Sequence, residues 1–284
     1  MRTADGAAPP PAMVTCFSAP RCLSTSLMYS FNSRPGCRVV DEPTYASYVL
    51  ATGAERPYKA ELLRAQKTDG AEVLSDLAAM SERQRAEGGM LYVKHIAKLC
   101  GASPEMMEAS CRCATNGGGR AFILLRDPAR VLRSWTRVLP TSLEESGFPA
   151  LERAFDALSR MVGASRVPVV DGAMLPANPR GALTALCAAL GIAFDERMLA
   201  WPAGGCAEDG CWAPWWYESL HETTGFDASR RHGGGGGGAA AGAAGGGVGG
   251  GREEDEEYRE ILRECVRIYE KLRSSGSLIV PVDS

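Results

Sequence analysis

Long apolar runs, net charge and histidine are all scarce in this 284-residue chain. No apolar stretch approaches the roughly 18–20 residues of a membrane-spanning helix, and residues 1–12 lack the apolar core of a secretory signal. The net charge of −3, from 31 basic and 34 acidic residues, argues against a protein that coats nucleic acid. These absences predict a cytoplasmic protein with neither a membrane segment nor a nucleic-acid partner.

Metal-binding patterns are missing as well. The chain has ten Cys but no CxxC pair, and it has only three His. Several thiols, such as Cys16 and Cys187, lie inside apolar stretches and are expected to be reduced and buried. Cys111 and Cys113 with a distant third ligand make a poor zinc pattern. We therefore expect reduced thiols and no metal site.

Short apolar runs alternate with helical patterns over the first 190 residues. The runs expected to form buried strands are residues 13–18, 38–40, 90–93, 121–125 and 167–170. Helical spacing follows at residues 24–33, 71–87, 129–138, 151–162 and 180–190. This alternation predicts an α/β fold with a central parallel sheet flanked by helices on both faces. Ligands of such folds bind at the carboxyl ends of the strands.

The last third of the chain differs in composition. Residues 201–216 hold four of the five Trp, and residues 211–217 fit either an aromatic lid or a small satellite core. Residues 233–251 hold 13 Gly, five Ala and one Val, so they are expected to be a flexible insertion. An amphipathic helix at about residues 253–273 should dock on the domain, because it is too short to fold alone. We predict a disordered N-terminus (1–12) and one domain over residues 13–284.

The first predicted strand leads into a turn and a helix start rich in hydroxyl groups, Pro20-Arg21-Cys22-Leu23-Ser24-Thr25-Ser26. Free backbone N–H groups and the helix dipole favour an anion at such a helix start. Arg21, Ser24 and Thr25 can donate to that anion, although an ordinary N-cap followed by a surface Arg is the alternative. The Walker pattern GxxxxGK[ST] is absent, which disfavours an ordinary ATPase or GTPase loop.

A second candidate anion site follows the fourth predicted strand. Arg126 stands just past the end of this strand, and Asp127-Pro128 suits a helix N-cap with Pro at the first helical position. Ser134 comes eight residues after Arg126, about two helical turns along. An Arg and a Ser placed in this way can grip one phosphate from two sides.

These two motifs resemble those of the sulfotransferase family, whose members bind 3'-phosphoadenosine 5'-phosphosulfate. In that family a PxxGxxx[ST] loop, often PRSGST, holds the 5'-phosphosulfate, and an RDPxxxxxS motif holds the 3'-phosphate. Residues 20–25 are similar to the first motif, and residues 126–134 to the second. Residues 171–199 also resemble the family segment "DL…P…L…LC.FLG..FDE.ML". The resemblance covers about residues 14–199.

The resemblance implies a three-layer, P-loop NTPase-like fold and transfer of a sulfuryl group to a hydroxyl of a small acceptor, with no metal. It assigns the donor nucleotide to eight residues: Arg21, Cys22, Leu23, Ser24, Thr25, Ser26, Arg126 and Ser134. Leu23 stands where the family has glycine. We therefore expect that the backbone of this loop does not take a glycine-only conformation at Leu23.

Sulfuryl transfer also needs a base for the proton of the acceptor and a cation for the charge that develops on the bridging oxygen. Glu42 ends the second predicted strand, where carbohydrate-type and bacterial sulfotransferases place a glutamate. His95 follows the third predicted strand, near the Lys-x-His of the cytosolic type. We expect Glu42 as the base, Lys94 or His95 as an auxiliary group, and Arg21 as the cation. The alternatives are structural: Glu42 is a carboxylate at a helix start, and His95 is a polar residue at a strand end whose hydrogen bonds are made within the protein.

Two other functions stay open. A nucleotide-binding protein without turnover is favoured by Leu23 and by the glycine run, and is opposed by Glu42, His95 and Arg126 together. A nucleotide-dependent kinase or hydrolase is opposed by the missing Walker lysine and the lack of a clear magnesium carboxylate. Residues 55–70 and 100–119 are expected to be pocket-lining loops, and they show no pattern that identifies the acceptor. Residues 230–232, Arg-Arg-His, are candidates to reach the 3'-phosphate, and the sequence does not indicate an oligomeric state.

Overall fold

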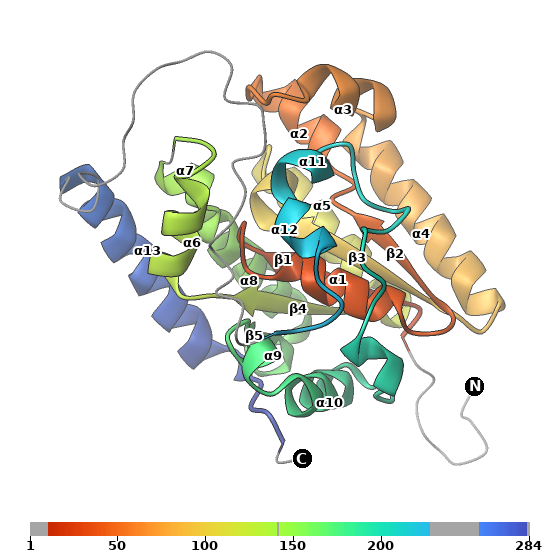
Figure 1. The fold of residues 1–284 in the computed structure, drawn as a ribbon. Helices are drawn as coiled ribbons and strands as arrows, with labels where there is room; N and C mark the ends of the chain where they lie inside the picture. Colours follow the sequence, from red (N-terminus) through yellow and green to blue (C-terminus); the bar gives the residue numbers. More distant parts are fainter. Residues whose placement is uncertain (1–10, 141, 228–255, 283–284) are drawn as a thin grey trace.

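The structure is a computed structural model that describes residues 11–140, 142–227 and 256–282. In this part of the chain six strands form one sheet of order β2-β3-β1-β4-β5-β6, with every neighbouring pair parallel. The strands are β1 (Met13–Ser18), β2 (Cys37–Asp41), β3 (Met90–Ile96), β4 (Arg120–Leu125), β5 (Pro168–Asp171) and β6 (Ser277–Leu278). The prediction of a central parallel sheet is confirmed (Figure 1).

Helices cover both faces of this sheet, as the three-layer prediction requires (Figure 1). One layer is a row of helices that pack on one another in the order α4 (Gly70–Ala86), α5 (Pro104–Thr115), α8 (Phe148–Val162) and α13 (Glu256–Ser275). The other layer contains α1 (Ser24–Asn32) and α10 (Pro179–Leu190). The remaining helices are α2 (Tyr45–Thr52), α3 (Lys59–Ala65), α6 (Pro128–Trp135), α7 (Leu143–Ser146), α9 (Met174–Ala177), α11 (Ala213–Trp216) and α12 (Glu218–His221). Short 3-10 turns are η1 (Ala97–Cys100), η2 (Asn116–Gly118), η3 (Ala164–Arg166) and η4 (Glu196–Leu199).

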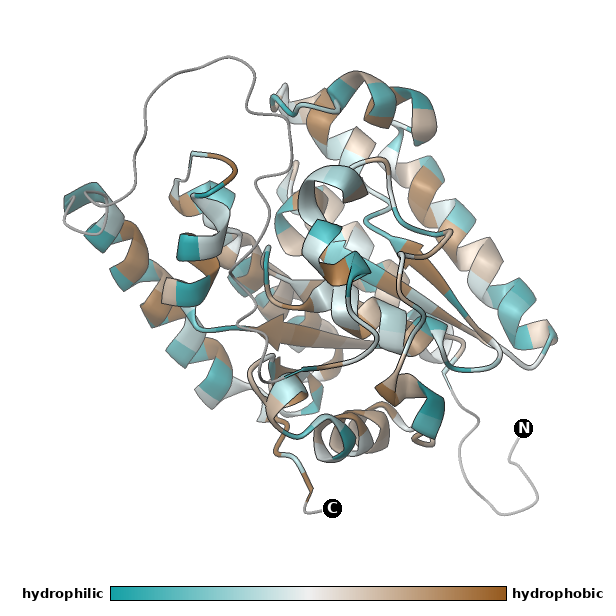
Figure 2. Cartoon of the chain, viewed as in Figure 1, coloured by the Kyte–Doolittle hydropathy of each residue, from teal (hydrophilic) through white to brown (hydrophobic). Residues whose placement is uncertain are grey.

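The core lies between these layers. β1 and β3 are buried along their whole length, as expected for central strands of a parallel sheet. Figure 2 shows the apolar strands at the centre and alternating apolar and polar turns along α13. The apolar stripe of α13 is buried, as its 3/4 spacing predicts, through Ile261, Cys265, Ile268, Tyr269 and Leu272.

The order of the strands positions the candidate site. β1 lies between β3 and β4, so the connection from β3 to β4 crosses over β1. In open α/β sheets ligands bind beside such a crossover, at the carboxyl ends of the strands. The predicted anion-binding turn follows β1, and Arg126 directly follows β4. The fold therefore brings the two predicted motifs to neighbouring strand ends.

Several element boundaries differ from the predictions. β3 continues to Ile96, so Lys94 and His95 lie among the last residues of the strand rather than after its end. Residues 100–119, expected to be a loop, contain α5, and residues 55–70 contain α3. The start of α5 did carry a signal, because Ser103 caps the Met106 N–H at 3.2 Å and Pro104 follows at the first helical position. The two-residue strand β6 has no pattern of its own in the sequence.

Some predictions concern the ends and the glycine run. Those for residues 1–10, 230–232 and 233–251 lie outside the described residues. Pro11 and Ala12, grouped above with the disordered N-terminus, are buried, and the Ala12 carbonyl accepts a hydrogen bond from the Leu91 N–H at 2.8 Å. Among the helices that the structure describes, none has the length and apolar composition needed to cross a membrane.

Candidate functional site

The turn between β1 and α1 has an unusual backbone. Arg21 and Leu23 both have positive φ angles, of 63° and 69°, in the left-handed region that glycine favours. The expectation for Leu23 is therefore wrong: the chain keeps this conformation although a leucine replaces the glycine. Each non-glycine residue in this region costs about 1–2 kcal/mol, so the surrounding structure must hold the turn in place.

Two glycines from distant segments hold this turn. A Cβ atom on Gly147, between α7 and α8, would lie 2.5 Å from Cδ of Pro20. A Cβ atom on Gly172, after β5, would lie 2.9 Å from the carbonyl oxygen of Cys22. The Gly172 N–H also donates to the Leu125 carbonyl at the end of β4, at 2.7 Å. The absence of side chains at these two glycines lets the turn closely approach the α7–α8 junction and the segment after β5.

The turn and the segment after β4 meet through arginine contacts. Arg21 Nε donates to the hydroxyl oxygen of Ser134 at 3.0 Å. Arg126 Nη1 donates to the carbonyl oxygen of Arg21 at 2.9 Å. Asp127 caps α6 by accepting from the Arg130 N–H, and Pro128 is at the first helical position, as predicted. Both motifs found in the sequence thus form one connected group.

This group has the properties of an anion site. Burial lowers the pKa of the Arg21 guanidinium, and the nearby charge of Arg126 lowers it further. The hydrogen-bond partners of Arg21 among the described residues are the Ser134 hydroxyl and the Trp216 carbonyl, both neutral. α1 begins with no side-chain cap and no acidic residue in its first turn. Two close cations and a helix N-terminus without a side-chain cap would all be stabilised by a bound anion.

A second group surrounds Lys94, which is 1% exposed. The parallel register pairs Asp41 of β2 with Lys94 of β3, which puts both side chains on one face of the sheet. Lys94 Nζ lies 2.7 Å from Asp41 Oδ1, 2.7 Å from Glu42 Oε1 and 2.6 Å from the Tyr217 hydroxyl. Tyr217 in turn donates to Asp41 Oδ2 at 2.8 Å and accepts from Trp212 Nε1 at 2.9 Å.

Glu42 has a strained backbone and a perturbed carboxyl group. Its φ is 43°, and its N–H donates to the Lys94 carbonyl at 2.9 Å. Burial raises the pKa of Glu42, Lys94 opposes this shift, and Asp41 adds to it. Burial alone would lower the pKa of Lys94, but the two carboxylates outweigh it and raise that pKa. Glu42 Oε2 has no hydrogen bond to any described residue, unlike Oε1. The hydrogen bonds of this carboxylate to the described residues therefore all fall on Oε1.

His95 lies on the other face of β3 from Lys94. Its ring stacks on Phe17 with centroids 5.3 Å apart, and its Nδ1 has no hydrogen-bond partner in the described chain. Burial lowers the pKa of His95 to about 3, so the ring is neutral. The structure brings Glu42 and Lys94 together but leaves His95 apart from them. The alternation of side chains along a strand accounts for this separation.

The Trp-rich stretch forms a satellite core and also contacts the site. Trp212 and Tyr217 are buried against residues of α2, α3 and η1. Trp216 stacks on Trp135 with centroids 5.1 Å apart, and its carbonyl accepts from Arg21 Nη1 at 3.1 Å. The sequence interpretation missed Tyr217, Asp41 and both glycines of the turn. Asp41, directly before Glu42 at a strand end, is the one that its position could have indicated.

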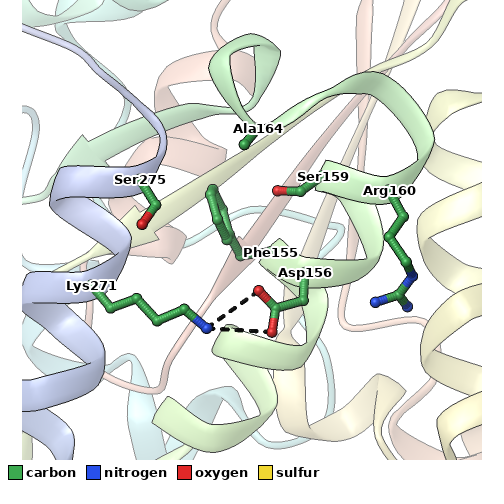
Figure 3. A pocket seen from close by; sticks show the side chains of 7 residues that line it. All are labelled: Phe155, Asp156, Ser159, Arg160, Ala164, Lys271 and Ser275. Atoms are coloured by element: carbon green, nitrogen blue, oxygen red, sulfur yellow. Dashed lines mark hydrogen bonds and ion pairs between the residues drawn. The ribbon is translucent and has the colours of Figure 1, made fainter.

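A shallow hollow of about 490 Å³ lies between α8 and α13, and none of its lining residues belongs to the two groups above (Figure 3). Its Lys271 and Asp156 side chains pair with each other across the hollow. Within residues 11–140, 142–227 and 256–282, no three His, Cys, Asp or Glu side chains come together in a way that could hold a metal ion.

A family model described as a sulfotransferase domain matches residues 12–233. The chain belongs to this family. The match includes the β1–α1 turn, Glu42, Lys94, Arg126 and the Trp-rich stretch, so both groups of the candidate site lie within the sulfotransferase domain.

Curated relatives of this sulfotransferase-family chain are longer proteins. Two proteins of Arabidopsis thaliana, named branched-chain-amino-acid aminotransferase-like proteins 1 and 2, are 40% and 38% identical to it over 224 and 222 residues. These alignments cover 78% of this chain but only 38% and 37% of the two relatives. The chain therefore spans less than two fifths of their length.

A solved sulfotransferase domain has the same fold. The domain from the curacin biosynthetic pathway superposes with a TM-score of 0.52 at 14% sequence identity, over 76% of this chain and 88% of that one. At this identity the likeness concerns the arrangement of strands and helices. It agrees with the P-loop-like α/β architecture described above.

Proposed function

We propose that the chain transfers a sulfuryl group from 3'-phosphoadenosine 5'-phosphosulfate to a hydroxyl of a small acceptor. The observation that carries this proposal is the contact between the two sequence motifs, through Arg21, Arg126 and Ser134. Two close guanidinium groups at neighbouring strand ends suit a ligand that carries two separate phosphate groups. Membership of the sulfotransferase family supports the same donor.

The turn after β1 is the proposed site of the 5'-phosphosulfate. Arg21 and the hydroxyl groups of Ser24, Thr25 and Ser26 would bind it, together with backbone N–H groups from Cys22 onward. Arg126 and Ser134 would hold the 3'-phosphate. When bound, the donor supplies an activated sulfuryl group, and 3'-phosphoadenosine 5'-phosphate is the leaving group. Arg21 would offset the negative charge that develops on the bridging oxygen.

Glu42 is the proposed base. It accepts the proton of the acceptor hydroxyl on Oε2, while Lys94 and Tyr217 hold Oε1 at 2.7 and 3.4 Å. Its raised pKa, caused mainly by burial, makes it a stronger base than an exposed glutamate. Lys94 opposes the rise in the pKa of Glu42 and orients its carboxylate. We assign no role in the transfer to His95, because its ring faces Phe17 on the other side of the sheet.

The proposed domain comprises residues 13–284, which is longer than the matched family model. α13 packs on α8, and β6 extends the sheet beyond β5, so the C-terminal segment shares the core of the domain. We propose that this domain acts without a metal, in the cytoplasm, on a small molecule rather than a nucleic acid. The low net charge of −3 supports the last point.

Calorimetric titration with 3'-phosphoadenosine 5'-phosphate, beside ATP and ADP, tests the donor. We expect tight binding of the bisphosphate and weak binding of ATP. Arg126→Met should weaken bisphosphate binding by roughly 10- to 100-fold, as expected for the loss of a charge-assisted contact. Arg112→Met is the matched control, since this arginine is exposed on α5 and pairs with Glu108. A preference for ATP, or no binding of the bisphosphate, would contradict the proposal.

A further inference from the structure

Two nearly buried cations near the proposed base share a single carboxylate. The side chains of Arg56 and Lys98 are each 6% exposed. Lys98 Nζ lies 2.9 Å from Glu145 Oε2, and Arg56 Nη2 lies 3.1 Å from the same oxygen. Among the described residues no other carboxylate lies within 4.0 Å of either cation. This group of three, the Lys98 cluster, therefore carries one excess positive charge where charges are normally balanced.

The remaining contacts of the cluster are neutral. Lys98 also donates to the backbone carbonyl of Glu145 at 3.0 Å. Arg56 donates through Nε to the Tyr45 hydroxyl at 3.1 Å and through Nη1 to the Glu55 carbonyl at 2.7 Å. Burial is the largest influence on the pKa of Lys98 and lowers it to about 8, against the opposing effect of Glu145. Glu145 is therefore the one carboxylate in the described chain that pairs directly with Lys98 and Arg56.

A stack of aromatic rings connects this cluster to the proposed donor site. The Lys98 ammonium lies 4.0 Å from the ring centroid of Trp135, which stacks on Trp216. The Arg21 guanidinium lies over Trp216, with Cζ 5.7 Å from the ring centroid. Cations favour positions over the faces of such rings. Lys98 and Arg21 are thus held at opposite ends of one rigid stack.

The cluster is also next to Glu42. The Tyr45 N–H donates to the Glu42 carbonyl at 3.1 Å, and the hydroxyl of Tyr45 contacts Arg56. Lys98 follows Lys94 by four residues, just beyond the end of β3. The negative charge of Glu42 is close enough to act on the pKa of Lys98. Tyr45 thus links this cluster to Glu42.

We propose that the acceptor is a hydroxy acid, whose carboxylate binds Lys98 and Arg56 where the Glu145 carboxylate lies in this structure. This inference rests on the proposed sulfotransferase function and specifies its acceptor. Glu145 belongs to the four-residue helix α7 and its side chain is 26% exposed, so it can turn outward. Glu145 thus occupies the place of the acceptor carboxylate until the acceptor binds.

Calorimetry on the protein saturated with 3'-phosphoadenosine 5'-phosphate tests this inference without requiring turnover. The probes are two hydroxy acids and their methyl esters: 4-hydroxybenzoate and 3-hydroxybutanoate with methyl 4-hydroxybenzoate and methyl 3-hydroxybutanoate. At neutral pH we expect at least one acid to bind roughly 10- to 100-fold more tightly than its ester, the effect of one charge-assisted contact. Equal affinities within both pairs, or no binding of either acid, overturn the inference.

Variants of the cluster should act in opposite directions. Lys98→Met and Arg56→Met each abolish the preference for the acid, whereas Glu145→Gln increases it because a competing carboxylate is lost. Lys59→Met is the matched control, since this lysine at the start of α3 pairs only with Glu55 and should leave the preference unchanged. A purely structural role of the cluster predicts no change in the acid-to-ester ratio in any variant, which would overturn the inference.

Binding of the bisphosphate separates the two proposals. Each variant must bind it as the parent protein does, which also shows that the variant is folded. If the parent protein binds the bisphosphate but does not distinguish acid from ester, only the hydroxy-acid inference is wrong. If the parent protein fails to bind the bisphosphate, the proposed sulfotransferase function and the inference are both wrong.

Discussion

At the carboxyl ends of β2 and β3, two carboxylates surround one ammonium group and leave one negative charge in excess. At the carboxyl ends of β1 and β4, two arginines lie close together, and Arg21 has only neutral hydrogen-bond partners in the described chain. The first group finds its partners within the protein, while the second is the one to which we propose an anion from outside binds. The first group should therefore contribute mainly to stability and proton transfer, and the second mainly to ligand affinity.

Replacing the proposed base should have the largest effect. Glu42→Gln keeps the size of the side chain but removes its basicity, so turnover should fall by about 10²- to 10⁴-fold. Bisphosphate affinity should stay the same, since Glu42 does not belong to the proposed nucleotide site around Arg21 and Arg126. In the parent protein, activity should fall as the pH drops through the raised pKa of Glu42, because protonation removes the base. Single-turnover transfer from radiolabelled donor measures both effects, and unchanged turnover would exclude Glu42 as the base.

Removing a cation from the proposed nucleotide site should lower bisphosphate affinity while leaving the free energy of unfolding nearly unchanged. Arg21→Met should weaken binding of 3'-phosphoadenosine 5'-phosphate by roughly 100-fold through the loss of charge-assisted contacts. The free energy of unfolding without ligand should change by less than about 1 kcal/mol, because the variant also removes repulsion from Arg126. Calorimetry and urea denaturation measure the two quantities. A large loss of stability with unchanged affinity would reverse the comparison above.

The opposite result, a loss of stability with little change in affinity, is expected in the group around Lys94 and Glu42. Tyr217→Phe removes the hydroxyl that contacts Lys94, Asp41 and Trp212, and leaves buried polar groups with fewer partners. The free energy of unfolding should fall by about 1–3 kcal/mol, while bisphosphate affinity changes little. Urea denaturation of Tyr217→Phe beside Tyr48→Phe, at a half-buried tyrosine of α2, provides the measurement and its control. Equal losses in both variants would show that the Tyr217 hydroxyl does not stabilise this group.

The acid-to-ester affinity ratio set by the Lys98 cluster should depend on pH, with an effect of about 10-fold or more. Burial lowers the pKa of Lys98 to about 8, so Lys98 is mostly charged at neutral pH and loses its proton as the pH rises. A bound carboxylate stabilises the charged form and raises that pKa. The preference for acid over ester should therefore be present at about pH 7 and decline above about pH 8. Calorimetry across this range measures the decline, and Lys98→Met should show no such dependence.

The sequence predicts the central elements well and the contacts between distant segments poorly. β1 has the predicted bounds because its apolar run is bounded by turn residues. Tyr217 could not be assigned to the site, because it contacts Asp41 across 176 residues and its neighbours in the sequence indicate only an aromatic cluster. The resemblance to a Lys-x-His pattern groups His95 with Lys94, both after a strand that the sequence predicts to end at residue 93. The extension of β3 to Ile96 separates the two side chains onto opposite faces.

Leu23 is the site of the smallest expected effect and the sharpest test of the turn. Glycine at this position removes the steric cost of a φ of 69°, but it also makes the unfolded chain more flexible, so Leu23→Gly should change the free energy of unfolding by no more than about 1 kcal/mol. Leu23→Val puts a β-branched residue into the same conformation and should destabilise by about 1–2 kcal/mol. Bisphosphate affinity should survive in the glycine variant, since the family has glycine there. If valine were tolerated as well as glycine, the turn would not need the left-handed residue, and its backbone would not be the feature that aligns Arg21 with Ser134.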